Sequence, residues 1–120
     1  MRLMVPESDA PASPAPPPHP RAFERDEPAF EAAVLRAFVK DRRLVSIPAR
    51  ERKKLVVYRF LLDEVLPDPA EVVEERDLNM RLALWHPDVA TLRRAFVEYG
   101  FVRRSGMTFK RSVPVRAPEG

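Results

Sequence analysis

The sequence predicts a mainly α-helical domain that carries a small β-hairpin near its C-terminal end. Two observations support this: apolar residues recur at helical spacing in four segments, and apolar and basic residues alternate around a Ser-Gly pair late in the chain. The 120 residues suit one domain, which we place at residues 27–111. Residues 1–22 hold half of the fourteen prolines and few large apolar groups, so we expect a disordered tail there, and we expect residues 112–120 to fray.

Two helices and an edge strand are predicted in the first half of this domain. The first helix covers residues 27–39, where Pro28 suits the first turn because its missing N–H is not needed there. A short apolar and β-branched stretch at residues 44–47 predicts an edge strand. The second helix covers residues 48–66 and has apolar residues around nearly its whole circumference, which predicts that it forms the buried centre of the domain.

Two further helices are predicted in the second half. After a short extended piece at residues 71–73, the third helix covers about 74–85. The fourth helix covers 89–99, between Asp88 as its N-cap and Gly100 as its C-terminal stop. The expected buried stripe of the third helix consists of Leu78, Leu82 and Trp85.

A β-hairpin is predicted at residues 101–111, with its turn at Ser105 and Gly106. The order is therefore helix, three-residue break, helix and basic hairpin, which is the order of a helix-turn-helix followed by a wing. We expect a winged-helix-like fold in which residues 27–39 form an additional N-terminal helix.

Several stretches of the sequence resemble a known prokaryotic family, and together they span nearly the whole folded region. The most specific stretch is Asp-Val-Ala-Thr-Leu-Arg-Arg at residues 88–94, followed by Gly100 and Arg103. The pattern is similar to that of the prokaryotic domain of unknown function number 2087. Members of that family are often labelled transcriptional regulators, so the resemblance implies a regulatory setting. The chain departs from the family pattern at Val73, where an aromatic residue is usual, and at Arg42 or Arg43, where a glycine is usual.

The composition argues against several function classes. Without cysteine the chain has no disulfide framework, no zinc-finger spacing and no thiol nucleophile. His19 and His86 are too far apart for a metal site, no glycine-rich phosphate loop is present, and neighbouring acids such as Glu74 and Glu75 diverge on a helix. We therefore expect no catalysis, no metal and no cofactor. No stretch approaches the roughly 20 apolar residues of a membrane span, and we expect a cytoplasmic protein.

The formal net charge of +3 is small, so the distribution of the basic residues decides whether they favour a polyanion. The predicted helix at residues 48–66 opens with Arg50, Lys53 and Lys54 and ends with acids, which opposes the helix macrodipole. A helix N-terminus that combines free N–H groups with several cations suits a phosphate. A solvated basic face is the alternative interpretation, and the sequence leaves both open.

The predicted fourth helix carries two arginines with different expected roles. At about 100° per residue, Arg93 falls beside the apolar face, and Arg94 falls on the outer side with Thr91. We expect Arg93 to be a structural anchor, because a partly buried guanidinium needs a partner. Asn79, close to the apolar stripe of the third helix, is expected to make a structural bond of the same kind. Arg94 and Thr91 are candidates for contact with a nucleic-acid groove, and a merely solvated Arg94 is the alternative.

The predicted hairpin carries four basic residues and no acid, namely Arg103, Arg104, Lys110 and Arg111. Basic residues on a wing contact phosphates, whereas charges on an edge hairpin also prevent aggregation between strands.

These residues favour a non-enzymatic DNA-binding domain with a role in transcriptional regulation, whose partner is duplex DNA. The alternative is a protein-interaction or dimerisation module of the same shape, in which the helix at residues 27–39 offers an apolar face and a homodimer forms. RNA binding through the same basic residues is a third interpretation.

Overall fold

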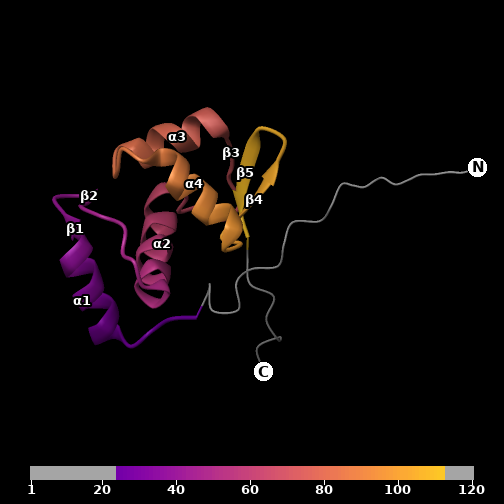
Figure 1. Ribbon diagram of the computed structural model, residues 1–120. Coiled ribbons are helices and arrows are strands. Elements are labelled where there is room, and N and C mark those ends of the chain that lie inside the picture. The colour runs from indigo at the N-terminus through magenta and orange to yellow at the C-terminus, as the bar shows by residue number, and fades with distance from the viewer. Residues whose placement is uncertain (1–23, 113–120) are drawn as a thin grey trace, which may run out of the picture.

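The computed structural model describes residues 24–112, which form four helices and two small antiparallel sheets (Figure 1). The elements in order are α1 (Pro28–Phe38), β1 (Val39–Lys40), β2 (Arg43–Leu44), α2 (Glu51–Val65), β3 (Val72–Glu74), α3 (Glu75–Ala83), α4 (Val89–Glu98), β4 (Val102–Ser105) and β5 (Thr108–Arg111). The predicted tails at residues 1–22 and 113–120 lie outside the described residues. Ser112 is described, and it is buried with its N–H donating to the carbonyl oxygen of Phe101 at 2.8 Å.

Helix α2 forms the centre of the described part, as its apolar circumference predicts. Its residues from Leu55 to Leu62 are buried except for the half-buried Phe60, and α1 and α4 pack against it. The predicted stripe of α3 is also confirmed, because Leu78 and Leu82 are fully buried and Trp85 is 6% exposed. The rest of the core contains the rings of Phe96, Phe101 and Phe109.

The three-stranded sheet has the order β3-β5-β4, with antiparallel pairing throughout. Because neighbours in register point to the same face, Val73, Phe109 and Val102 lie toward the core, where all three are buried. The opposite face carries Lys110 and Arg103, which are direct cross-strand partners. This sheet continues directly into α3 through β3, and into α4 through the turn at Gly100.

The predicted edge strand at residues 44–47 differs from the structure. Only Arg43 and Leu44 form β2, and they pair with β1 through a two-residue turn at Asp41 and Arg42. Both turn residues have positive φ, 52° and 60°, which is the backbone of a type I′ hairpin turn. The sequence does not reveal this hairpin because its turn lacks the glycine that usually marks a type I′ turn.

Two predicted boundaries also shift. Helix α2 begins at Glu51 rather than at residue 48, because Pro48 is buried in the core and the chain bends at residues 49–50 before the helix starts. The hairpin turn lies at Gly106 and Met107, one residue later than predicted, because Ser105 is still paired with Thr108. Gly106 takes φ 60° at the first turn position, where glycine is favoured in a type II′ turn.

Candidate nucleic-acid interface

Helix α4 presents a narrow polar face to solvent. Ala90, Arg94 and Glu98 are exposed at spacings of four residues, and Leu92 and Phe96 are fully buried on the opposite side. Asp88 caps the helix, because its Oδ1 accepts the Thr91 N–H at 3.2 Å. Hydrogen bonding from the Thr91 side chain, and then this backbone bond, lowers the pKa of Asp88. Among the described residues Arg94 has no hydrogen-bond or ion-pair partner, so its guanidinium is available to a ligand.

Arg93 and Asn79 join α4 to α3. The Nη1 atom of Arg93 donates to Oδ1 of Asn79 at 2.6 Å, and both residues are half-buried. The sequence places both beside apolar stripes and assigns both to the fold, and in the structure each is the other's partner. The bond therefore links the two helices of the candidate interface.

The start of α2 carries Arg50, Lys53 and Lys54, and no side chain caps the helix. Arg50 is itself the N-cap residue, with φ −82° and ψ 136°, and its side chain makes no capping bond. Within the described residues none of the three side chains has an acidic partner. The free N–H groups of the first turn are therefore surrounded by cations.

This basic start of α2 lies beside the C-terminal end of α4. The rings of Tyr58 and Tyr99 are 5.6 Å apart, and the pKa of Tyr99 is raised by burial and by nearby carboxylates, Glu51 among them. Burial, with the same kind of charge effect from Glu98, raises the pKa of Tyr58 to about 12. Both phenols are therefore protonated at neutral pH and act as packing groups between the two helices.

The hairpin divides its four basic residues between two roles. Arg103 and Lys110 are exposed cross-strand partners on the outer face of the sheet, and neither has an acidic partner among the described residues. Arg104 contacts Glu75 with Nη2 at 2.8 Å from Oε1, donates to the Gly106 carbonyl oxygen, and lies 5.2 Å from the centre of the Phe109 ring.

Arg111 is engaged inside the fold. Its Nη1 donates to the Leu66 carbonyl oxygen at 2.9 Å, its Nη2 lies 3.1 Å from Oδ1 of Asp63, and its side chain is 18% exposed. It therefore joins β5 to the end of α2, just as Arg104 joins the hairpin to the start of α3. The structure thus places two of the four predicted phosphate-contacting residues of the hairpin in internal ion pairs.

A buried ionic network at the other side of α2 is absent from the sequence prediction. Glu31 on α1 lies 3.3 Å from Arg59 on α2 and 2.6 Å from Arg25, and it also accepts the Asp26 N–H. The side chains of Glu31 and Arg59 are 10% and 9% exposed. Hydrogen bonding from Arg25 is the largest cause that lowers the pKa of Glu31. The sequence does contain a signal for this network, because Glu31 and Arg59 each lie within an otherwise apolar helix face.

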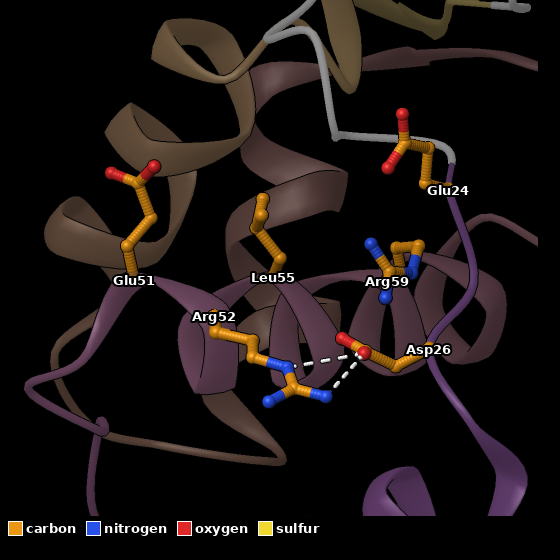
Figure 2. A pocket seen from close by; sticks show the side chains of 6 residues that line it. All are labelled: Glu24, Asp26, Glu51, Arg52, Leu55 and Arg59. Carbon is orange, nitrogen blue, oxygen red and sulfur yellow. Dashed lines mark hydrogen bonds and ion pairs between the residues drawn. The ribbon is translucent and has the colours of Figure 1, made fainter.

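A pocket of about 180 Å³ lies next to this network, between the segment before α1 and the first turns of α2 (Figure 2). Its lining residues are Glu24, Asp26, Glu51, Arg52, Leu55 and Arg59. Figure 2 shows Arg52 turned toward Asp26, whose Oδ1 accepts bonds at 2.8 and 3.1 Å, and the guanidinium also stacks on Phe30 at 3.8 Å. Of the charges that line this pocket, Arg52 pairs with Asp26 and Arg59 pairs with Glu31. Within residues 24–112, no three His, Cys, Asp or Glu side chains are grouped to hold a metal ion.

The described part of the chain contains no helix long and apolar enough to span a membrane. No match was found for the chain among curated proteins or solved structures. A family model does match residues 43–111, which is more than half of the chain and covers β2 to β5. Its description is "Uncharacterized protein conserved in bacteria (DUF2087)", and the chain belongs to this family.

Proposed function

We propose that this protein is a non-enzymatic, winged-helix DNA-binding protein with a role in transcriptional regulation. The observation that carries the proposal is the arrangement of residues 51–111. Three helices are followed by a hairpin, β5 lies between β3 and β4, and only a short break separates α3 from α4. In a helix-turn-helix protein the second helix of the motif enters the major groove, and here that helix is α4.

Most of the candidate residues support this role because the fold does not use their charges. They are Arg94 on α4, Arg103 and Lys110 on the sheet, and Arg50, Lys53 and Lys54 at the start of α2. Arg94 is suited to the groove together with Thr91, which lies one helical turn before it, and the other cations are suited to flanking phosphates. Arg104 and Arg111 are left out of the proposed interface because they form ion pairs within the fold.

Acidic residues limit the direction from which a duplex approaches. Glu74 and Asp77 at the start of α3 are exposed and would repel phosphates. The start of α2 lies beside the end of α4, so its three cations flank the C-terminal half of α4 and outnumber the exposed acids Glu51 and Glu98 there. We therefore expect the backbone contacts on that side, and not at the N-terminus of α3.

Fluorescence anisotropy with a labelled mixed-sequence DNA duplex tests the proposal. Affinity should fall steeply between about 50 and 200 mM salt, because each neutralised phosphate releases counterions. Arg94→Glu and the double variant Lys53→Glu/Lys54→Glu should both weaken binding, and the double variant should reduce the salt slope by about 2. Arg36→Glu is the matched control, because this exposed arginine lies on α1, outside the proposed interface.

Absence of binding at about 50 mM salt, or an equal loss in the Arg36→Glu control, would refute the proposed interface. Duplex RNA of the same sequence is measured in parallel. If duplex RNA bound more tightly through the same residues, RNA would replace DNA as the proposed partner.

A further inference from the structure

The outer face of α3 carries an apolar stripe that nothing in the described chain covers. Met80 and Leu84 are 63% and 70% exposed and lie one helical turn apart, with the small exposed residue Ala83 beside them. The opposite side of the same helix buries Leu78 and Leu82 completely. Helix α3 is therefore apolar on two sides, although a helix at the surface of a soluble domain ordinarily has one apolar side.

The apolar stripe is longer than the helix itself. The Leu44 N–H donates to the Trp85 carbonyl oxygen at 2.8 Å, so the end of β2 lies beside the segment that follows α3. Val45, the next residue, is 57% exposed. Within residues 24–112, the other two large exposed apolar residues are Val72 in the sheet and Met107 in its hairpin turn.

Opposite charges flank this stripe at its two ends. Asp77 is exposed near the start of α3, and at about 100° per residue it lies only about 20° around the helix from Leu84. Arg43 lies at the other end, where its Nη1 reaches the Leu84 carbonyl oxygen at 3.4 Å. Neither residue has an ion-pair partner among the described residues.

We infer that this face of α3 binds a second copy of the same chain, with the two α3 helices antiparallel about a two-fold axis. In a symmetric interface each patch meets itself, so residues from opposite ends of the stripe come together. The antiparallel arrangement covers Met80 and Leu84 on both chains. It also brings Asp77 of each chain to the partner's Arg43, twice per dimer.

The charges disfavour the parallel arrangement of the same two helices. A parallel pair would bring Asp77 next to its own copy, and Arg43 next to its own copy, and like charges at close range are destabilising. The antiparallel pair also aligns the two helix dipoles favourably. This interface uses none of the residues that we assign to nucleic acid, so the dimer inference does not depend on the proposed function.

Sedimentation equilibrium of the full chain tests the inference. The wild type should approach twice the chain mass of 13.8 kDa with increasing concentration. Leu84→Glu and Met80→Glu should weaken the dimer by at least about tenfold, because each places a charge in the apolar centre of the interface. Met107→Glu is the matched control, since this residue is equally exposed but lies at the hairpin turn, and the variant should dimerise like the wild type.

A charge exchange tests the antiparallel geometry directly. Asp77→Lys alone sets two cations against each other across the interface, and Arg43→Glu alone sets two carboxylates against each other, so each variant alone should dimerise at least about tenfold more weakly. A mixture of the two variants should form a heterodimer of wild-type strength, because both contacts across the interface are then attractive. Thermal melts of each variant, followed by circular dichroism, verify that the monomers remain folded.

A wild type that remains monomeric at about millimolar concentration would overturn the inference. Single charge variants that dimerise like the wild type, or a mixture that fails to restore dimerisation, would overturn it as well. DNA binding and dimerisation, both measured on Arg94→Glu and Leu84→Glu, separate the two proposals. Arg94→Glu should dimerise like the wild type but bind DNA more weakly, and Leu84→Glu should still bind DNA but as a monomer.

Discussion

At the scale of single residues, the backbone of Arg42 is the clearest departure from ordinary preference. Its φ of 60° lies in the left-handed region, which costs a residue with a side chain roughly 1–2 kcal/mol. The Arg42 side chain offsets part of that cost, since it lies 5.5 Å from the Trp85 ring and 3.9 Å from Glu64. That ion pair is weak because the Arg42 side chain is 82% exposed.

A comparison of two truncations isolates the backbone contribution at this position. Arg42→Gly and Arg42→Ala both remove the side-chain contacts, but only glycine adopts the turn without strain. We therefore expect Arg42→Gly to be more stable than Arg42→Ala by about 1 kcal/mol in urea unfolding. The same pair at Arg36 in α1 should show the opposite order, because glycine is disfavoured in a helix by up to about 1 kcal/mol. Equal stabilities of the two Arg42 variants would show that the turn is not strained.

Glu31 is the second residue whose chemistry yields a prediction. Glu31→Gln removes a carboxylate that pairs with the buried Arg59 guanidinium, so we expect a loss of about 3 kcal/mol of unfolding free energy at pH 7. The exposed Glu98→Gln is the matched control and should change stability by less than about 0.5 kcal/mol.

The effect of Glu31 should depend on pH in a defined direction. Its pKa is lowered in the folded state from the ordinary value of 4.5, so its contribution is complete above that value and is lost as the pH falls through the lower, folded value. The difference between wild type and Glu31→Gln should therefore narrow in acid. Urea unfolding at pH 7 and near pH 3 measures it, and a constant difference would show that the fold does not lower the pKa of Glu31.

At the scale of elements, α2 and α4 begin in contrasting ways. Helix α4 has a working cap in Asp88, whereas α2 begins at Arg50 with no side-chain cap and with cations in its first turn. Asp88→Ala should cost about 1 kcal/mol, because it removes the capping bond. Arg50→Asp should instead add about 1 kcal/mol, since it supplies a cap and a favourable charge at the helix dipole.

The same Arg50→Asp variant connects stability with the proposed function. If the uncapped basic start of α2 is retained to bind phosphate, this more stable variant should bind a DNA duplex several-fold more weakly than the wild type. Thermal melts and anisotropy on one preparation measure both quantities. A gain in stability with unchanged DNA affinity would remove Arg50 from the proposed interface.

The helices could be predicted because their signals are local. Apolar spacing locates α2, α3 and α4, and Asp88 and Gly100 mark the ends of α4 within one residue. The start of α2 was wrong by three residues because burial of Pro48, a tertiary contact, delays the helix. The β1–β2 hairpin was missed for a different reason. Its type I′ turn is made by Asp41 and Arg42, without the glycine that usually marks such a turn in a sequence.

At the scale of the whole molecule, the roles of the cations could not be predicted, because they depend on which acids the fold brings near. Arg104 and Arg111 lie on the same side of the sheet as the buried Val102 and Phe109 and meet acids of other elements, whereas Arg103 and Lys110 lie on the opposite side. Neither contact has a local signal, since Glu75 and Asp63 are distant in sequence. The exposed stripe on α3 does have a local signal in the sequence, because Met80 and Leu84 fall on the opposite side of the helix from Leu78 and Leu82.

The relation between α1 and the family domain leads to a prediction about the whole fold. The family match begins at residue 43, after α1, yet α1 packs on α2 with Val34 buried and supplies Glu31 to Arg59. In the sequence-based alternative this helix offers its apolar face to a partner, but in the structure that face contacts the core of its own chain. The domain that folds is therefore larger than the segment that the family model matches.

Removal of residues 1–42 should consequently destabilise the family segment. The loss includes the apolar contacts of α1 and the Glu31–Arg59 ion pair, and it exposes to water the face of α2 that α1 covers. Small domains are stable by only about 5–15 kcal/mol, so the truncated chain should unfold at much lower urea concentration or expose its core to a hydrophobic dye. Ala33→Ser, on the exposed side of α1 in the full chain, should change stability by less than about 0.5 kcal/mol. A truncated chain with wild-type stability would mean that α1 is an appendage to the domain and not part of its core.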